Sequence, residues 1–181
     1  MAAETKSVGA SGHETTTSLE RVDEEKQSAL ARAGTLNKVL TFFLGHEEYA
    51  IDILFIEEIT RPLSVTYVPR VPPYIMGVIS LRGRVIPVLN LHVRLGLTAF
   101  ALGKKTRFII CQMDDVEVGL VADKVNDVVS LDHYQLEPPP AKIAASGSGF
   151  IKNIGHIGER VLIVLDIEKV LQIHFGRDAS S

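Results

Sequence analysis

Several groups of residues approach known catalytic or ligand-binding motifs, and each lacks a feature that the chemistry needs. The run from Gly96 to Thr106 resembles a phosphate-binding loop, but six residues separate Gly96 from Gly103 where four are needed. Ser146-Gly-Ser-Gly149 lacks the strand and the spacing of a nucleophile elbow. No two of the histidines stand at metal-ligand spacing, and Cys111 has no partner thiol. These motifs therefore predict neither a metal site nor a catalytic site.

Paired carboxylates are the remaining catalytic possibility. The sequence contains Glu47-Glu48, Glu57-Glu58 and Asp114-Asp115. The first and the last pair fall in predicted hairpin turns, where solvated carboxylates are common. General acid/base work needs two carboxylates in one cleft, which the sequence does not reveal. A hydrolase or a sensor built on these pairs is therefore kept as an alternative.

Composition and charge narrow the function classes. The chain has 181 residues, of which 46% are hydrophobic and 23% charged, as in an ordinary globular protein. Its formal charge is -3, and its basic residues stand singly or in pairs such as Lys104-Lys105. This distribution argues against a broad electrostatic grip on nucleic acid or on anionic lipid.

The sequence also predicts a cellular compartment. A single cysteine cannot form an internal disulfide, and Cys111 stands in an apolar run typical of a core thiol in a reducing compartment. The N-terminus, from Met1 to Gly12, has no charged start followed by an apolar stretch, so it does not resemble a signal peptide. No apolar run approaches the ~20 residues of a membrane helix. We expect a cytoplasmic protein without direct membrane insertion.

Residues 1–36 differ from the rest of the chain. They are rich in small and polar residues and contain no aromatic residue, so they cannot bury enough apolar surface to offset the entropy of ordering. We expect residues 1–17 to be disordered. Ser18 to Ala33 contains good helix formers but only a thin apolar stripe, which predicts a weak helix. Residues 1–36 are thus predicted to form a flexible tail.

From Asn37 onward, short β-branched runs recur between glycines, prolines and charged pairs. They predict about ten short strands with little helix between them, which is typical of a mainly β protein with barrels or a sandwich. The predicted strands are Val39–Leu44, Glu48–Ile51, Ser64–Val68, Gly77–Leu81, Arg84–Leu89, Arg107–Met113, Val116–Val121, Asp127–Leu131, Ile151–Ile157 and Arg160–Leu165.

An internal repeat organises these strands. Arg84–Leu95 aligns with Arg160–Leu171 at a constant offset of 76 residues, and Ile51–Ile59 aligns less closely with Leu120–Val128 at an offset of 69. The repeat predicts two similar β-units, about 37–97 and 104–175, with a loop from Glu137 to Gly149 inside the second.

Each unit is predicted to end in a short helix. Asn90 and Asp166 are good N-cap residues at equivalent positions, and Gly96 and Gly176 stand where these helices should stop.

The repeat also separates residues that the fold requires from residues that are free to bind a partner. Arg84 matches Arg160, so we interpret both as structural, with aliphatic stems covering an apolar barrel end. Arg82 matches Gly158, so a hairpin of this kind can close without an arginine there. Gly83 is expected to supply the positive φ of the turn.

Two further residues of this hairpin have positional meaning. Gly77 is expected to mark a close backbone approach or a bulge. Pro87 cannot donate to a ladder, so its strand is predicted to be an edge there or to direct the missing donor outward.

Three stretches resemble the CheW family of chemotaxis coupling proteins. They are IMGVISLRGRVIPVLNL over Ile75–Leu91, EYAIDILFIEEI over Glu48–Ile59, and RVLIVLDIEKVL over Arg160–Leu171. The likeness covers about residues 37–175 in the expected order. One departure is Ser80, where the family usually has Asn beside the Leu-Arg-Gly turn.

The resemblance implies two SH3-like five-stranded β-barrel subdomains packed together, with short helices. It places a CheW-like domain at 37–175 and leaves residues 176–181 as a C-terminal tail. It also implies a scaffold without enzyme activity or cofactor that couples the cytoplasmic tips of chemoreceptors to the histidine kinase CheA, in the cytoplasm, with recruitment to membrane-associated receptor arrays.

The resemblance further implies which residues bind. Arg82 and its neighbours Gly83 and Gly77 would belong to the receptor-binding groove, with Ile56 and Glu58 at its border. Glu58 is expected to be exposed, and Ile56 could equally be a core residue. The regulatory domain of CheA would be the second partner. The apolar residues Val65, Tyr67 and Val68 are candidates for that contact, since exposed apolar patches mark partner sites.

A small-barrel nucleic-acid-binding protein is the main alternative, because such barrels can bind single strands through aromatic side chains and basic grooves. The charge of -3, the low aromatic content of 6% and the absence of interleaved basic and aromatic residues argue against it.

Overall fold

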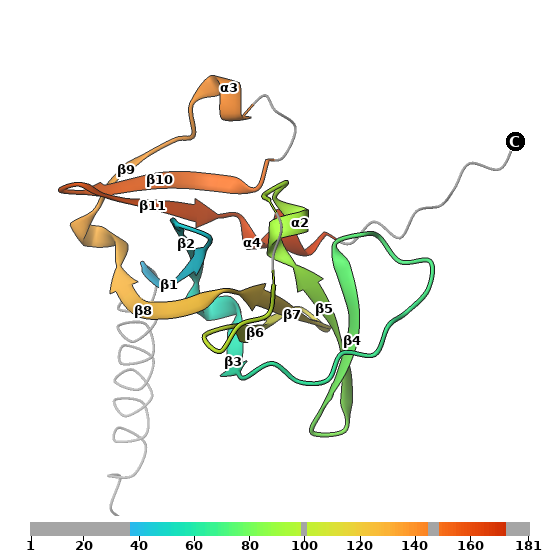
Figure 1. The fold of residues 1–181 in the computed structure, drawn as a ribbon. Coiled ribbons are helices and arrows are strands. Elements are labelled where there is room, and N and C mark those ends of the chain that lie inside the picture. The colour runs from blue at the N-terminus through green and yellow to red at the C-terminus, as the bar shows by residue number, and fades with distance from the viewer. Residues whose placement is uncertain (1–36, 99–100, 145–148, 173–181) are drawn as a thin grey trace, which may run out of the picture. The chain divides into compact units, whose positions relative to one another are not determined.

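The computed structural model describes residues 37–98, 101–144 and 149–172 (Figure 1). The predicted tails over 1–36 and 176–181, including the helix from Ser18 to Ala33 and the stop at Gly176, lie outside the described residues.

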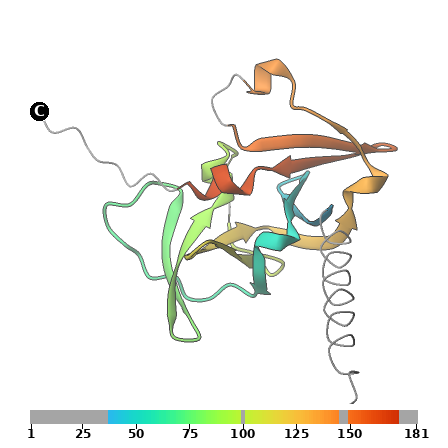
Figure 2. The same cartoon turned by 180° about the vertical axis from the view of Figure 1, so that it is seen from behind.

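The described residues form two β-sheets. The first sheet, called sheet A, has the strand order β8-β1-β2-β11-β10-β9, and sheet B has the order β3-β6-β7-β5-β4 (Figures 1 and 2). The strands of sheet A are β1 (Lys38–Leu44), β2 (Glu47–Asp52), β8 (Lys124–Ser130), β9 (Gln135–Glu137), β10 (Ile151–Ile157) and β11 (Arg160–Leu165). Those of sheet B are β3 (Ile56–Thr60), β4 (Ile75–Leu81), β5 (Arg84–Asn90), β6 (Arg107–Met113) and β7 (Val116–Ala122).

The mainly β class with two packed subdomains is confirmed, but the sheets are not closed barrels. Within the described ranges, the outermost strands of each sheet are not hydrogen-bonded to one another. Sheet A also has six strands where five were predicted, because β9 pairs with β10 through Gln135, Leu136 and Glu137.

The repeat extends to nearly every element. Strand β6 follows β1 at an offset of 69, and β10 follows β4 at an offset of 76. The same parallel pairing recurs, because Val88 faces Gly119 in sheet B while Val164 faces Ala50 in sheet A. The two sheets are therefore two copies of one five-stranded arrangement, with β9 added to the first.

The two sequence units have exchanged their hairpins, so each sheet contains strands from both units. The hairpin β1–β2 pairs with β8 and β11, while β6–β7 pairs with β3 and β5. In Figure 1 the hairpin β1–β2 accordingly lies beside β11. The sheets thus do not follow the predicted units 37–97 and 104–175. The physical reason is that equivalent hairpins present the same pairing edges, so the local pattern is satisfied by either partner.

Most of the predicted strands are confirmed to within a few residues. The predicted strand Ser64–Val68 is wrong, because only Thr66 makes a bridge, to Val78 of β4. Proline flanks this segment at Pro62 and Pro69, and proline cannot donate to a ladder. The strands β3 and β9 were not predicted.

The short helices begin where the sequence placed them. The side chain of Asn90 accepts from the backbone N–H of Val93 and starts α2 (Leu91–Arg94), and Asp166 does the same for Lys169 in α4 (Ile167–Leu171). Gly96 ends the turn after α2 with φ +71°, as predicted. Three other short helical elements are η1 (Ile53–Phe55), η2 (Leu131–His133) and α3 (Ala141–Ala144).

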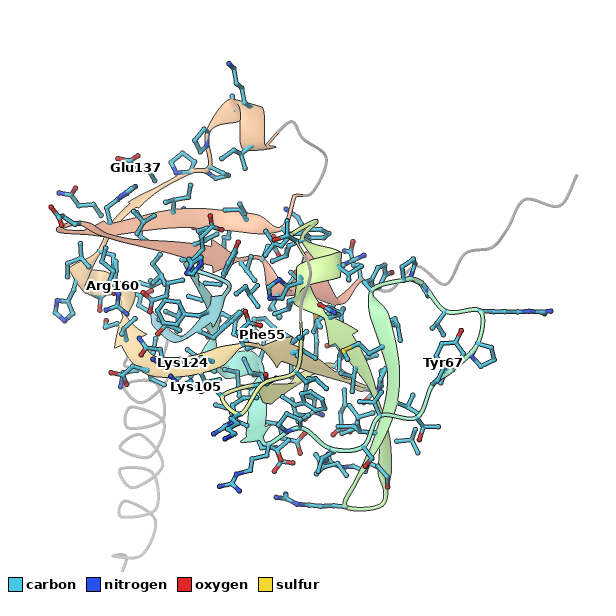
Figure 3. The ribbon with its side chains drawn as sticks, in the orientation of Figure 1. Phe55, Tyr67, Lys105, Lys124, Glu137 and Arg160 are labelled. Carbon is cyan, nitrogen blue, oxygen red and sulfur yellow. The ribbon has the colours of Figure 1, made fainter. Side chains whose placement is uncertain are left out.

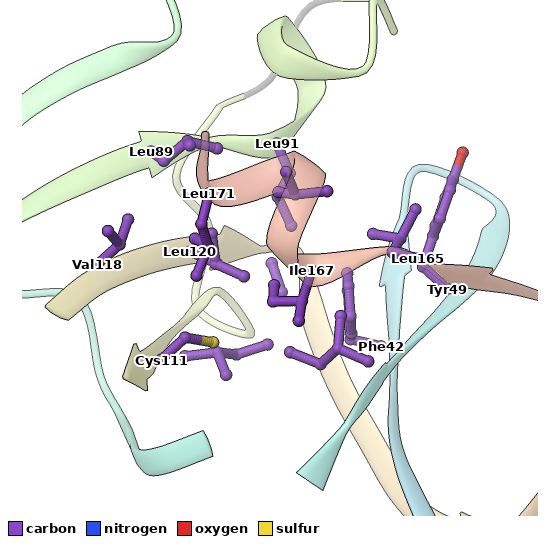
Figure 4. Close-up of a cluster of buried hydrophobic side chains, with 14 of the residues drawn as sticks. Phe42, Tyr49, Leu89, Leu91, Cys111, Val118, Leu120, Leu165, Ile167 and Leu171 are labelled. Carbon is purple, nitrogen blue, oxygen red and sulfur yellow. The ribbon is translucent and has the colours of Figure 1, made fainter. Parts of the chain in front are cut away.

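The largest hydrophobic cluster joins both sheets with the helices α2 and α4 (Figure 4). It includes Phe42 of β1, Leu120 of β7, Leu91 of α2 and Ile167 of α4. Burying each such side chain contributes roughly 1.5–3 kcal/mol. Cys111 lies in the same cluster, fully buried, so its predicted role as a core residue is confirmed.

Candidate functional site

The hairpin turn between β4 and β5 carries the arginine that the repeat marked as free for binding. Arg82 and Gly83 have φ +51° and +80°, so both central residues adopt the left-handed conformation of a type I′ turn. Such turns favour Asn or Gly at the first position, because a larger side chain is strained there. The equivalent turn in sheet A places Gly158 at that position, with φ +56°. An arginine at this strained position is therefore not explained by the turn.

Arg82 forms an ion pair with Glu58 of β3. The distance from Nη2 to Glu58 Oε2 is 2.7 Å, and the side chains are 72% and 20% exposed. The prediction that Glu58 is exposed was wrong, because only a fifth of its side chain is accessible. Its Oε1 is buried and has no hydrogen-bond partner among the described residues.

Ile56 and Gly77, the other predicted receptor residues, take part in packing. Ile56 is half-buried against the largest hydrophobic cluster. Gly77 has φ +144°, and a Cβ there would lie 2.2 Å from the backbone oxygen of Thr66. The register of β4 and β5 also shifts between Ile75 and Gly77. Both predictions for Gly77, a close approach and a bulge, are therefore confirmed.

Gly77 allows the segment after Leu63 to lie against β4. Thr66 exchanges two backbone hydrogen bonds with Val78, of 2.8 and 2.9 Å. Val78 thereby uses its backbone groups on Thr66 rather than on Pro87, its neighbour in β5. Strand β5 lies inside the sheet, so Pro87 is not on an edge. Strand β7 pairs with β5 only from Val88 onward. Neither β4 nor β7 therefore needs a backbone donor from Pro87.

The predicted kinase-contact residues lie on this same segment but do not form one exposed patch. Tyr67, which is labelled in Figure 3, is 76% exposed. Val65 instead packs against the hydrophobic cluster that includes Ile79 and Ile86, and Val68 is half-buried.

Arg84 and Arg160 form equivalent ion pairs. The sequence predicted these two arginines only as structural residues. Arg160 makes two hydrogen bonds to Glu48, of 2.7 Å from Nε and 2.6 Å from Nη2. The hydrogen bonds from Arg160 hold the pKa of Glu48 below its ordinary value, although burial acts in the opposite direction. Glu48 is buried in β2, so its predicted place in a solvated turn was wrong.

In sheet B, Arg84 contacts two carboxylates, Glu57 at 2.9 Å and Glu117. A hydrolase built on the acidic pairs would need two carboxylates in one cleft. These two do converge, but an arginine lies with them and all three side chains are part-exposed on a sheet surface. The arrangement is that of a surface ion cluster, so it does not support a hydrolase.

Sequence reasoning missed a basic groove, defined by Ile59, Lys105, Arg107, Lys124 and Val125, with a volume of about 430 Å³. The pair Lys104-Lys105 was a signal for part of this groove, but its neighbours were not predictable, because Lys124 is brought in by β8. Lys105 and Lys124 lie near one another in Figure 3.

Among the described residues, no three or more His, Cys, Asp or Glu side chains come together in a way that could hold a metal ion. No helix in the described ranges is long and apolar enough to cross a membrane.

Known proteins resemble this chain over most of its length. The model of the family described as CheW-like domain matches residues 38–174. The chemotaxis protein CheW of Klebsiella aerogenes is 37% identical over 144 residues, which cover 80% of this chain and 87% of that protein. The chemotaxis protein CheW of Bacillus subtilis is 36% identical over 149 residues, covering 82% and 96%.

A solved structure agrees with these relatives. The crystal structure of the scaffolding protein TtCheW from Thermoanaerobacter tengcongensis superposes with a TM-score of 0.66 and 27% identity, covering 77% of this chain and 90% of that one. None of these three proteins is named as a nucleic-acid-binding protein, so that alternative gains no support. The family match, the identities and the shared fold together establish that the chain belongs to the family of proteins with a CheW-like domain.

Proposed function

We propose that this protein is a non-enzymatic scaffold in chemotaxis, which couples the cytoplasmic tips of chemoreceptors to the histidine kinase CheA. Relatives named chemotaxis protein CheW and a structural neighbour named a scaffolding protein support this role. The coupling domain in this proposal spans residues 37–175. The protein would act in the cytoplasm and be recruited to receptor arrays at the membrane.

The observation that carries the receptor contact is the state of Arg82. Its backbone is strained and its side chain is 72% exposed, while the equivalent turn in sheet A has Gly158. The ion pair with Glu58 holds the guanidinium near β3, and the donors not used by Glu58 can reach acceptors on a receptor helix. Pre-orientation of this kind lowers the entropy that binding must overcome.

The other proposed receptor residues support the contact in different ways. Glu58 positions Arg82 through their ion pair of 2.7 Å. Gly83 permits the turn, and Gly77 permits the close approach of Thr66 that fixes β4. Ile56 supports β3 from the core side.

For the kinase, the proposed contact is the segment with Val65, Tyr67 and Val68. Tyr67 is the best supported of the three, since a tyrosine with 76% exposure offers both apolar area and a hydroxyl. Val65 would act indirectly, by holding the segment against the sheet. Coupling then requires no catalysis by this chain. A change in the conformational state of the kinase changes which contacts are available, and this shifts the population of the bound complex.

The test is a titration of the full chain against the regulatory domain of a CheA-type kinase and against a receptor signalling fragment, both from the same cell. Three proteins are compared: the unaltered chain, Arg82→Glu and Arg82→Asn. Asn suits the left-handed turn position, so the Asn variant removes the charge while it relieves the strain. Each is checked for folding by its thermal unfolding midpoint.

We expect the unaltered chain to bind both partners. Both variants should keep kinase binding and lose receptor binding by about tenfold or more, as expected when a charged contact is removed or reversed. If Arg82→Asn binds receptors as tightly as the unaltered chain, Arg82 is only a turn residue. If the unaltered chain binds neither partner, the coupling role is wrong.

A further inference from the structure

The residues that follow α2 close one corner of the fold. His92 of α2 is buried, with Nε2 3.0 Å from Oδ1 of Asp123 and Nδ1 3.1 Å from the carbonyl oxygen of Thr98. Asp123, between β7 and β8, also accepts a hydrogen bond of 2.7 Å from the backbone N–H of Gly45 in the β1–β2 turn. Leu97 donates its backbone N–H to the oxygen of His92 and packs against the largest hydrophobic cluster. The segment after α2 thus covers a corner made by a helix, a strand junction and a turn.

The internal repeat places an equivalent corner at α4. At the offsets of 76 and 69 residues, the equivalent residues are Glu168 for His92, Leu54 for Asp123 and Asp114 for Gly45. The turn conformation is retained, since Gly45 and Asp114 have φ +64° and +53°. The ion pair is not retained, because a glutamate and a leucine replace its two members. The second corner therefore has the backbone plan of the first without its polar closure.

In the described residues, this second corner is a pocket of about 480 Å³. Its apolar wall is formed by Leu54, Phe55 and Met113. Phe55 and Met113 pack on the largest hydrophobic cluster, whereas Leu54 is 58% exposed. Asp114 and Glu168 also line the pocket, and neither takes part in an ion pair within the described ranges. The pocket thus combines an uncovered apolar wall with two carboxylates.

The repeat also identifies a segment that could cover this pocket. The residues equivalent to Leu97 and Thr98 are Ile173 and His174, which begin the stretch 173–181. The preceding residue, Gln172, lines the pocket, and Nη2 of Arg94 donates to its backbone oxygen at 2.7 Å. The stretch therefore leaves the described structure from a fixed point on the rim of the pocket. A segment tethered so closely has an effective concentration on the order of millimolar or more at its site.

The composition of residues 173–181 complements the pocket. Ile173 and Phe175 are apolar, and His174 and Arg177 can donate to carboxylates. In the first corner, the helix side chain of His92 meets an oxygen of the covering segment. In the second corner, the helix side chain is itself a carboxylate, so the complementary cover must supply donors.

We infer that residues 173–181 fold back over this pocket, with Ile173 against Leu54 and the basic side chains of the segment against Asp114 and Glu168. The two halves of the repeat then close their corners in the same way, each with the residues that follow its helix. The pocket is accordingly an internal contact of the chain and not a partner site. The inference does not depend on the proposed function, because it concerns one chain alone.

The experiment uses the full chain with Gln112→Cys, which places a probe thiol on the pocket and leaves its apolar side chains unchanged. The labelling rate of this thiol is measured in the folded protein with no further change and with Ile173→Ser, Arg177→Gln or Ile157→Ser. Ile157 of β10 is the matched control, because it is a 41% exposed isoleucine that does not line the pocket. The chain without Gln112→Cys gives the rate of Cys111, and thermal unfolding midpoints verify folding.

We expect the probe thiol to react at least about tenfold more slowly than in the denatured chain, because a covering segment excludes the reagent. Ile173→Ser should raise the rate about fivefold, since it removes the apolar anchor, whereas Ile157→Ser should leave the rate within about twofold. Arg177→Gln should raise the rate about twofold at low salt and remove its salt dependence, because a charged contact is lost.

Three results would overturn the inference. Rapid labelling of the probe thiol beside the unaltered segment would show that the pocket is open. An equal increase with Ile157→Ser would show that any loosening of the fold exposes the thiol. Slow labelling that persists with both Ile173→Ser and Arg177→Gln would assign the pocket to another occupant, and a rate that falls as the protein concentration rises would identify a second copy of the chain. If Ile173→Ser does not fold, Arg177→Gln decides the question alone.

Discussion

Glu48 and Glu117 occupy the same position in the two sheets, yet the fold shifts their pKa values in opposite directions. Each is the second residue of its strand, β2 or β7, and each accepts an arginine from the equivalent strand. The hydrogen bonds from Arg160 lower the pKa of Glu48. Burial, followed by the hydrogen bond with Glu57, raises the pKa of Glu117.

One further position of the repeat contributes to this difference. Asn126 donates a hydrogen bond of 3.1 Å to Glu48 in sheet A, and the equivalent residue in sheet B is Glu57. A neutral donor stabilises a carboxylate, whereas a second carboxylate opposes its ionisation. One copy has therefore become a neutralised internal ion pair and the other a surface cluster that retains negative charge.

The first prediction concerns acid stability. Glu48→Gln should lower the free energy of unfolding by about 2 kcal/mol near neutral pH, because Glu48 is buried and Arg160 would lose its charged partner. A carboxylate with a lowered pKa contributes stability above its unfolded pKa of about 4.3 and loses it as the pH falls through the lower folded value. The difference in unfolding free energy between the variant and the unaltered chain should therefore be smaller in acid than at neutral pH. Urea unfolding under both conditions measures it.

Glu117→Gln is the matched control for that measurement. Its raised pKa means that ionisation is disfavoured in the folded protein, so the substitution should cost less at neutral pH than Glu48→Gln does. A cost for Glu48→Gln that is the same in acid and at neutral pH would contradict the assignment.

A second prediction separates steric clash from backbone strain at two glycines. Gly77→Ala should destabilise by about 3 kcal/mol or more, because the new Cβ would meet the backbone of Thr66 at 2.2 Å. At Gly83 a Cβ meets nothing within 4 Å, so Gly83→Ala should cost only the strain of a positive φ, about 1–2 kcal/mol. Urea unfolding of both variants measures the two losses of unfolding free energy. Equal losses would argue against the close approach of Thr66 to Gly77.

A third prediction concerns the contact between α2 and α4. Arg94 donates to the backbone oxygens of Val170 and Gln172, at 3.1 and 2.7 Å, and lies between the rings of Tyr74 and Phe150, at 4.3 and 4.8 Å. Lysine keeps the charge but not the planar, multiply donating group. Arg94→Lys should therefore lower the free energy of unfolding by about 1–2 kcal/mol, and full retention of stability would show that charge alone suffices.

A fourth prediction tests the buried thiol. Burial raises the pKa of Cys111 to about 12, and the side chain is fully enclosed. The thiolate is the reactive form, so Cys111 should not react with a thiol reagent in the folded protein at mildly alkaline pH. Reaction should become complete in denaturant, and rapid labelling of the folded chain would contradict the packing of the largest cluster.

Much of the local structure follows directly from the sequence. Strand positions, the N-caps Asn90 and Asp166 and the positive φ of Gly83 depend on residues within one turn or one hairpin. The internal repeat and the resemblance to the CheW family were also readable, because matching residues stand at constant offsets. The residues Arg82 and Gly77 were identified for the same reason, since the turn and the bulge are local features.

The tertiary structure decided the features that depend on partners distant in sequence. Two similar hairpins offer the same edges, so only packing determined that β1–β2 pairs with β11 and β6–β7 with β5. The burial of Glu48 and of one oxygen of Glu58 and the meeting of Lys105 with Lys124 follow from that exchange. A local pattern fixes which face a side chain takes, but the charges and apolar groups it meets there are set by the chain that is packed against it.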